Sequence, residues 1–279
     1  MALLVPALLV LTFLWTTVLW SPRPLLGVRV GCPRLIGHRG VRGSLPENTL
    51  AAFRAAFDAG LDGVECDVQR THDGALVLVH DFDVEEGSVV RTTLKDLRRS
   101  GPIPERLEDL LESMGCYPGR LLNIELKVRG LRGLQLARST AQAVREAGLL
   151  DRVLVSSFSP LALLFARVAD SRLRVALLFA PGVRLYLPSE LVAALLHVDA
   201  LHPHYTLVDG PLIARAHRRR LSVHTWTVNE PGRVAELLSA GVDGIIADDP
   251  AELLDAAGRG RCSRFRPATS RTVQGSAEE

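Results

Sequence analysis

The most informative stretch of the chain is Val64-Glu65-Cys66-Asp67-Val68, which has the pattern of an apolar strand with carboxylates at alternate positions. Side chains at positions i and i+2 of a strand point to the same face, so Glu65 and Asp67 can share one cation. Cys66 points to the opposite face, where we expect it to pack in the core. Charged side chains in a buried strand are costly unless they serve a metal or a charged ligand. This strand should therefore face a core on one side and a site on the other.

Other strand ends carry charge in a related way. Apolar runs end in His38-Arg39 and in His80-Asp81, and Asn123-Ile124-Glu125-Leu126-Lys127 again places charge at alternate positions. Histidines at strand ends beside carboxylates suit the general-base and general-acid roles. His80 could also reach a metal. Glu65, Asp67 and Glu125, without a cysteine–histidine cluster, favour a hard cation with oxygen ligands, Mg²⁺ or Ca²⁺, over zinc.

Strand-like runs alternate with amphipathic helical patterns from Leu35 onward. The predicted strands are residues 35–37, 63–68, 121–126, 153–157, 173–179, 200–202, 222–228 and 244–247, and the predicted helices are residues 49–59, 134–147, 161–169, 211–219 and 233–240. Eight strands with helical connections predict a (β/α)8 TIM barrel. A ninth strand, residues 76–79, follows a turn at residues 71–74 that is too short for a parallel crossover, so we expect an irregular hairpin in the second unit.

The barrel prediction matters because catalytic side chains collect at the carboxyl ends of barrel strands. The positions that this rule brings to one mouth are His38, Arg39, Glu65, Asp67, Glu125, Lys127, Phe158 and Trp226. His202 and His204, at the end of the sixth strand, could line the same mouth, whereas His224 should pack in the seventh strand. Phe158 has an alternative interpretation as simple core packing.

Eight motifs, in order, resemble the glycerophosphodiester phosphodiesterase family, which is distantly related to the phosphatidylinositol-specific phospholipases C. They are HRG at 38–40, PENT at 46–49, ExD at 65–67, THDG at 71–74, HD at 80–81, IELK at 124–127, TWTVN at 225–229 and DGIIADDP at 243–250. The resemblance covers roughly residues 35–254. It implies metal-dependent hydrolysis of glycerophosphodiesters to sn-glycerol 3-phosphate and an alcohol.

The resemblance also implies roles for individual residues. His38 and His80 do the acid–base work: one deprotonates a glycerol hydroxyl that attacks phosphorus, and the other protonates the departing alcohol. The cyclic glycerophosphate formed in this way is then opened by water. The cation, Arg39 and Lys127 meet the charge that grows on the phosphoryl oxygens. Glu47 orients His38 or Arg39.

Other expectations concern the substrate and the helix caps. Phe158 and Trp226 would form an apolar wall for the glycerol carbons. Asn48 or Thr49 can cap the helix that follows, and residues 248–250 likewise are expected to cap the last helix.

After His80, the insertion that can cover the mouth is short in this chain, so bulkier diesters would be admitted. The alternatives are therefore a lysophospholipase D that acts on acylated glycerophosphodiesters and a non-catalytic barrel that binds phospholipid headgroups.

Composition agrees with one large domain. The chain has 279 residues, 47% of them hydrophobic, and a single α/β barrel commonly needs about 250 residues. A net charge of +2 is too small to indicate a nucleic-acid partner. The four cysteines have no paired spacing, so disulfides are not required.

The amino-terminal residues form a separate unit. Residues 2–20 contain no charged side chain and would rise about 28 Å as a helix, close to the thickness of a bilayer core. We assign residues 1–22 as a transmembrane anchor or signal segment, residues 33–258 as the barrel and residues 259–279 as a disordered tail. A cleaved signal peptide would have a basic region at its start and an A-x-A site before Pro22, and this segment has neither. We therefore prefer a single-pass anchor over secretion. The arginines that follow it would place the catalytic domain on the cytoplasmic side.

Overall fold

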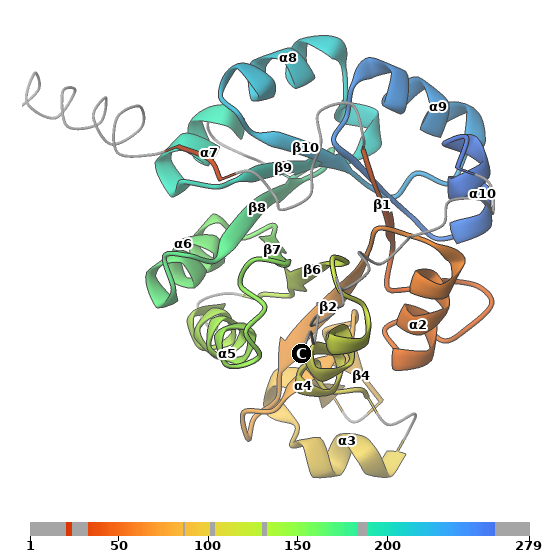
Figure 1. Ribbon diagram of the computed structural model, residues 1–279. Helices are drawn as coiled ribbons and strands as arrows, with labels where there is room; N and C mark the ends of the chain where they lie inside the picture. The colour runs from red at the N-terminus through yellow and green to blue at the C-terminus, as the bar shows by residue number, and fades with distance from the viewer. Residues whose placement is uncertain are drawn as a thin grey trace, which may run out of the picture.

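The computed structural model describes residues 21–23, 33–85, 87–100, 104–129, 133–183 and 189–259. Its main sheet has the strand order β1-β11-β10-β9-β8-β7-β6-β2-β3, and a further pairing of β1 with β2 closes it. All neighbouring pairs except β2–β3 are parallel, so the closed part is an eight-stranded parallel barrel surrounded by helices (Figure 1). The predicted TIM barrel is confirmed.

The barrel strands match the predicted runs closely. They are β1 (Arg34–Gly37), β2 (Gly63–Arg70), β6 (Leu121–Leu126), β7 (Val153–Ser157), β8 (Arg174–Phe179), β9 (Ala200–Pro203), β10 (Ser222–Thr225) and β11 (Gly244–Ala247). β3 (Leu76–Leu78) pairs antiparallel with β2, which confirms the hairpin predicted for the second unit. β10 is shorter than predicted, because the residues after Thr225 leave the strand ladder and the Val228 N–H donates to the Ile246 carbonyl.

The helices lie outside the barrel (Figure 1). They are α2 (Leu50–Ala59), α3 (Leu94–Ser100), α4 (Leu107–Ser113), α5 (Gly133–Glu146), α6 (Pro160–Ala169), α7 (Ser189–Leu196), α8 (Gly210–Arg218), α9 (Pro231–Ala240) and α10 (Pro250–Ala256). The insertion after β3 holds a two-stranded ribbon, β4 (Asp83–Val84) with β5 (Gly87–Ser88), followed by α3. The sequence patterns had not predicted α3, α4 or α7, each of which has eight residues or fewer.

Alternation along the strands separates the core into two regions. Val64, Cys66 and Val68 of β2 are fully buried and pack in the main cluster with the helices, so Cys66 lies in the core as expected. In every strand, the residues at the alternate positions point into the barrel. There Leu154 of β7, Ala176 of β8 and Ala200 of β9 form a small separate cluster. β2 therefore has an apolar outer face, and its inner face carries the two carboxylates.

Two histidines lie within the barrel. The rings of His202 and His224 are stacked with centroids 5.0 Å apart, and both side chains are fully buried. Burial lowers the pKa of His224 to about 4 and the pKa of His202 also falls well below its usual range. The expectation that His202 lines the mouth is therefore wrong, because its inward position on β9 places it among the interior side chains. His224 packs in its strand as predicted.

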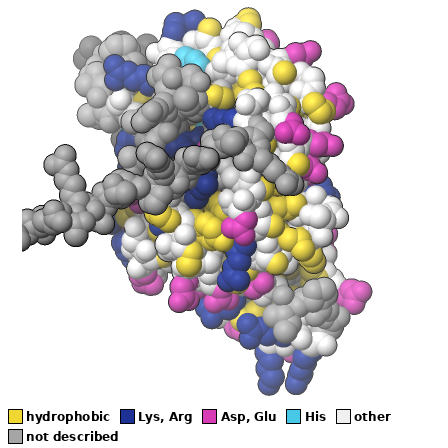
Figure 2. Space-filling model, turned by 45° about the vertical axis from the view of Figure 1, so that its right-hand side comes forward, with side chains coloured by type: hydrophobic (Ala, Val, Ile, Leu, Met, Phe, Trp, Pro, Cys, Tyr) yellow, Lys and Arg dark blue, Asp and Glu magenta, His cyan; other side chains and the backbone are white. Residues whose placement is uncertain are grey.

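The surface has no large field of a single sign on the face shown in Figure 2, where basic and acidic side chains are interspersed with apolar ones. Among the described residues, no helix is long and apolar enough to cross a membrane. Residues 1–20 of the predicted anchor and residues 260–279 of the predicted tail lie outside the described residues.

Candidate active site

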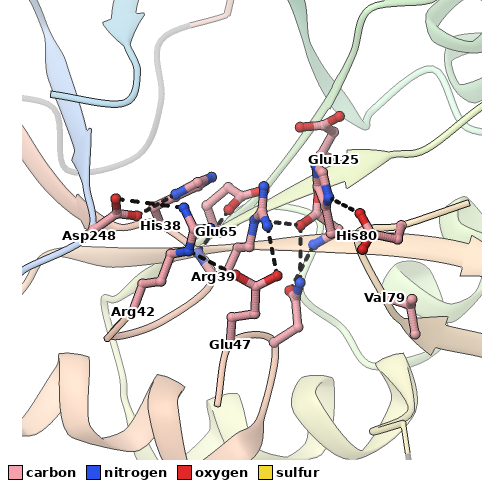
Figure 3. A network of polar contacts seen from close by, with 12 residues as sticks. His38, Arg39, Arg42, Glu47, Glu65, Val79, His80, Glu125 and Asp248 are labelled. Atoms are coloured by element: carbon pink, nitrogen blue, oxygen red, sulfur yellow. Dashed lines mark hydrogen bonds and ion pairs between the residues drawn. The ribbon is translucent and has the colours of Figure 1, made fainter. Parts of the chain in front are cut away.

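A cluster of carboxylates lies at the carboxyl ends of β2 and β6. Asp67 is in register with Glu125 on the neighbouring strand, and Glu65 precedes them by one inward position. One oxygen from each of Glu65, Asp67 and Glu125 lies within 4.8 Å of the others. Glu65 and Asp67 are only 3% and 1% exposed. The three predicted metal ligands therefore lie together at the mouth of the barrel. Figure 3 labels Glu65 and Glu125 of this cluster.

Two cationic side chains border this cluster. The Arg39 backbone N–H donates to Glu65 Oε2 at 3.0 Å, and its guanidinium Nε lies 3.0 Å from Asp67 Oδ2. Lys127 Nζ lies 3.0 Å from Glu125 Oε1 and 3.6 Å from Asp67 Oδ1. Three carboxylates, two of them buried, thus face two cations.

Burial and mutual repulsion shift the pKa values of the carboxyl groups in this cluster. Burial, together with repulsion from Asp67 and Glu125, raises the pKa of Glu65 well above its usual range. Burial and repulsion from Asp67 raise the pKa of Glu125 to about 7, although Lys127 acts in the opposite direction. Burial alone would lower the pKa of Lys127, but the charges of Glu125 and Asp67 raise it overall. Glu65 Oε1 is buried without a hydrogen-bond partner among the described residues. These features fit a divalent cation held by oxygen ligands.

The turn after β1 has a backbone that only certain residues allow. A Cβ on Gly37 would lie 2.2 Å from the Gly40 carbonyl oxygen, and one on Gly40 would lie 2.7 Å from the backbone of Ala52. Gly40 has φ 90° and Arg39 has φ 51°, so the turn passes through the left-handed region. This turn points the Arg39 N–H at Glu65. Backbone strain of this kind is typical of functional sites.

Two residues of the PENT motif form hydrogen bonds with Arg39 and Asp67. Glu47 Oε1 accepts a hydrogen bond from Arg39 Nη1 at 2.7 Å, and Glu47 Oε2 lies 3.0 Å from Arg42 Nε. Glu47 therefore contacts Arg39, which is one of the two partners expected for it. Asn48 donates from Nδ2 to Asp67 Oδ2 and accepts from the Asp67 N–H, both at 3.0 Å. Thr49, rather than Asn48, caps α2.

His38 forms a pair with an acidic residue that the sequence analysis had placed elsewhere. His38 Nδ1 lies 2.7 Å from Asp248 Oδ1. Asn229 Nδ2 donates to Asp248 Oδ2 at 2.6 Å, and the Asp248 N–H donates to Asn229 Oδ1 at 3.0 Å. Burial alone would raise the pKa of Asp248, but the hydrogen bonds with His38 and Asn229 lower it overall. The cap predicted at residues 248–250 is confirmed for Asp249, which caps α10, whereas Asp248 does not take part and turns to His38.

His80 lies on the loop that follows β3, on the other side of the carboxylates from His38 (Figure 3). Its Nδ1 is 2.8 Å from Asp81 Oδ1, and its side chain is 35% exposed. Gln69 Nε2 holds this loop by donating to the carbonyls of Val79 and Asp81, at 3.0 and 2.7 Å. Two histidines thus flank the carboxylate cluster, one partly buried beside an acid and one near the open rim.

Aromatic rings form part of the rim. Phe158 and Trp226 meet edge to face with centroids 5.6 Å apart, and His204 meets Trp226 in the same way at 5.2 Å. Phe82, from the insertion, lies 5.8 Å from Lys127 Nζ and 4.5 Å from the Arg129 guanidinium carbon. These rings provide apolar surface beside the charged cluster.

Sequence reasoning missed several residues that the structure brings to this site. They are Asn48, Gln69, Phe82, Asn229 and Asp248. Asn48, Asn229 and Asp248 lie within the motifs already singled out, so the signal was present. The first had been interpreted as part of a helix start, and the last as a helix cap.

Comparison with known proteins shows the class to which this site and barrel belong. The model of the glycerophosphoryl diester phosphodiesterase family matches residues 38–252. A glycerophosphodiester phosphodiesterase of Caldanaerobacter subterraneus subsp. tengcongensis is 32% identical over 81% of this chain and 98% of its own length. A crystal structure of a glycerophosphodiester phosphodiesterase from Parabacteroides distasonis is 25% identical, with a TM-score of 0.73 over 81% of this chain and 98% of that chain.

The fold comparison extends to a phosphodiesterase of Oleispira antarctica, solved in complex with the product sn-glycerol-3-phosphate. It is 24% identical and has a TM-score of 0.74 over 81% of this chain and 97% of that chain. The class is thus that of phosphoric diester hydrolases built on a TIM barrel. Within it, the chain belongs to the glycerophosphodiester phosphodiesterase family. Its activity is the hydrolysis of glycerophosphodiesters.

Proposed function

We propose that the enzyme releases sn-glycerol 3-phosphate and an alcohol from glycerophosphodiesters with the help of one divalent cation, Mg²⁺ or Ca²⁺. The observation that carries this proposal is the buried cluster of Glu65, Asp67 and Glu125, which is short of positive charge and lies between two histidines. These three residues would hold the cation. When bound, it would supply positive charge to the phosphoryl oxygens as a Lewis acid. The sn-glycerol 3-phosphate complex of the Oleispira antarctica protein supports the product.

The chain's own residues would move the protons. Because His38 Nδ1 faces the carboxylate of Asp248, its Nε2 is left to accept a proton from a substrate hydroxyl. The negative charge of Asp248 stabilises the imidazolium that forms. His80, nearer the open rim, would protonate the departing alcohol, and the two histidines would exchange roles when water opens the cyclic glycerophosphate. An intramolecular nucleophile of this kind needs no serine or cysteine.

Arg39 and Lys127 would bind the phosphoryl oxygens while remaining in contact with the carboxylates. Their positive charge stabilises the transition state, in which the charge on the phosphoryl group grows. Phe158 and Trp226 would face the glycerol carbons, and Glu47 would keep Arg39 in place.

The test is product analysis with glycerophosphocholine and lysophosphatidylcholine, each with and without a chelator, beside calorimetric titration of Mg²⁺ and Ca²⁺ into the protein. We expect choline and sn-glycerol 3-phosphate from the first substrate, loss of turnover with chelator, and loss of metal binding in Glu65→Gln. Preferred cleavage of the acylated substrate would support the lysophospholipase D alternative. We set aside the non-catalytic barrel, because the family match shows an enzyme.

We also propose that the amino-terminal apolar residues attach the enzyme to a membrane as a single-pass anchor. Their support is the absence of charge over residues 2–20. Co-flotation of the full chain with lipid vesicles, and its loss when residues 1–22 are removed, would test this proposal.

A further inference from the structure

The residues that follow the predicted anchor are fixed to one end of the barrel. The Arg23 N–H donates to Asp199 Oδ1 at 2.9 Å, and Arg23 Nη2 donates to the Leu173 carbonyl at 2.8 Å. Leu173 directly precedes β8 and Asp199 directly precedes β9, so both lie at the amino-terminal face of the barrel. Pro22 is buried. In Figure 1, the short segment of residues 21–23 lies beside α7, away from β2 and β6.

The attachment is built around a buried carboxylate. Asp199 is 1% exposed, and its Oδ2 accepts from Arg167 Nη2 at 2.7 Å and from the Val175 N–H at 3.0 Å. Arg167 Nη1 also donates to the Leu173 carbonyl at 2.9 Å. Arg23 therefore joins a network that already ties α6 to β8 and β9. We call these contacts of Arg23 the amino-face clip.

The clip limits where the apolar segment can leave the barrel. Arg23 follows Trp20 by three positions, and three residues reach at most about 11 Å. The active-site residues lie at the carboxyl ends of the same parallel strands. Strands of four to eight residues, at about 3.3 Å per residue, separate the two faces by roughly 13–26 Å. The segment therefore leaves from the face opposite the mouth.

The same face carries a run of exposed arginines beside the clip. Arg218 ends α8, and Arg219 and Arg220 follow it before β10; none of the three forms an ion pair with a described residue. β9 and β10 are in register at Ala200 and Ser222, and the Ser222 N–H donates to the Asp199 carbonyl at 3.3 Å. The run therefore lies next to the point where the chain enters the barrel. Basic side chains close to a membrane-spanning segment are attracted to anionic headgroups, by about 1 kcal/mol each.

We propose that the amino-terminal face of the barrel is its membrane-facing surface, with Arg218, Arg219 and Arg220 against anionic headgroups and the mouth turned toward water. This rests on the anchor and on the hydrolytic function proposed above. This orientation determines which class of substrate can reach the mouth. A lysophospholipid in the same bilayer has its phosphodiester in the headgroup layer, behind the barrel, whereas a deacylated glycerophosphodiester reaches the mouth from solution. The enzyme therefore acts on water-soluble diesters.

The orientation can be measured without activity. In the full chain with Cys32, Cys116 and Cys262 replaced by serine, Ser171→Cys places a label on the amino-terminal face and Ser44→Cys places one at the mouth; both serines are exposed. Cys66 is buried and will not react. The labelled proteins are bound to phosphatidylglycerol vesicles that carry a headgroup quencher. We expect quenching at least threefold stronger at position 171 than at position 44.

A charge variant tests the arginine run. Arg218→Ala/Arg219→Ala/Arg220→Ala should reduce quenching at position 171 at least twofold, whereas the matched triple variant Arg91→Ala/Arg98→Ala/Arg99→Ala, at exposed arginines of the insertion, should not. Equal effects of the two triple variants would exclude a specific role for the run. Equal or stronger quenching at position 44 would overturn the orientation while leaving the anchor and the hydrolytic activity intact. A chain that does not float with vesicles would overturn both the anchor and this inference, and product analysis would still judge the hydrolysis.

Discussion

The pairing of His38 with Asp248 leads to the sharpest prediction for catalysis. Asp248→Asn keeps the size of the side chain and removes its charge. In the native protein, Asp248 Oδ1 lies 2.7 Å from His38 Nδ1, and Asn229 holds the carboxylate from its other side. An amide in this place can still form a hydrogen bond, but it no longer stabilises a positively charged imidazole ring. We therefore expect the substitution to slow turnover and to leave the fold unchanged.

The expected loss follows from the contacts. A hydrogen bond to a charged group contributes about 1.5–3 kcal/mol, against about 1 kcal/mol for a neutral one. Two unit charges about 4 Å apart near a protein surface attract each other by about 4 kcal/mol, which is the upper limit. The two kinds of hydrogen bond differ by up to about 2 kcal/mol and the charge pair contributes up to about 4 kcal/mol, so we expect the transition state to lose about 2–4 kcal/mol of stabilisation. At about 1.36 kcal/mol per factor of ten, kcat falls by roughly 30- to 1,000-fold.

The assay compares Asp248→Asn with Asp249→Asn. Asp249 accepts hydrogen bonds from the backbone of α10, and asparagine caps helices about as well, so the control removes one charge without touching His38. We expect kcat for glycerophosphocholine to fall only in the first variant, with metal affinity by calorimetry unchanged in both. An Asp248→Asn enzyme within threefold of wild-type kcat would refute the charge stabilisation that we assign to the carboxylate.

Four further predictions follow from the site and the fold. His80→Ala should lower kcat by roughly 10²–10⁴-fold without changing the melting temperature, and near-normal turnover would remove His80 from the mechanism. Chelation should abolish turnover and Mg²⁺ or Ca²⁺ should restore it; full activity after exhaustive dialysis against EDTA would contradict a metal site. Removal of residues 1–22 should give a soluble, active barrel, because the clip begins at Arg23, and an unfolded product would show that the apolar segment belongs to the core. Arg172 hydrogen-bonds Asp170 and lowers the pKa of that carboxyl to about 2, so Asp170→Asn should cost about 1 kcal/mol of unfolding free energy at pH 7, allowing for solvent around Arg172. This cost should shrink as the pH falls below the ordinary value near 4 and disappear below about 2, which urea titrations at several pH values would measure; a cost independent of pH would exclude the ion pair as its source.

The barrel and the carboxylate cluster could be predicted from the sequence because both depend on local regularities. Because side chains alternate along a strand, Glu65 and Asp67 must share a face. The parallel pairing of β2 with β6 then places Glu125 beside them. The partner of His38 could not be found in this way. Asp248 is separated from it by 210 residues, and two consecutive aspartates before a proline are equally typical of a helix cap. Only the closure of β11 against β1 decides which aspartate caps and which turns inward.

The backbone conformation of Asn48 was a second feature that could not be predicted from the sequence. Asn48 has φ 57°, a left-handed conformation that asparagine tolerates, and this turn directs its amide to Asp67 and leaves the cap to Thr49. Nothing in the spacing of PENT distinguishes these two uses. The short helices α3 and α4 were missed for a different reason: seven residues are too few for a helical period to stand out from the surrounding loop.

The balance of charge at the mouth connects the site to its reaction. When Glu65, Asp67 and Glu125 are all ionised, as ligands of a cation must be, they exceed the cations of Arg39 and Lys127 by one negative charge. A divalent cation reverses this excess to one positive charge, and a phosphodiester brings one negative charge, so the site becomes neutral when metal and substrate are both bound. A third protein cation in place of the metal would give a neutral empty site with no electrostatic preference for either ligand. We therefore propose that the third carboxylate makes substrate binding depend on the metal; Glu65 Oε1, which is buried without a hydrogen-bond partner among the described residues, is the oxygen left for it.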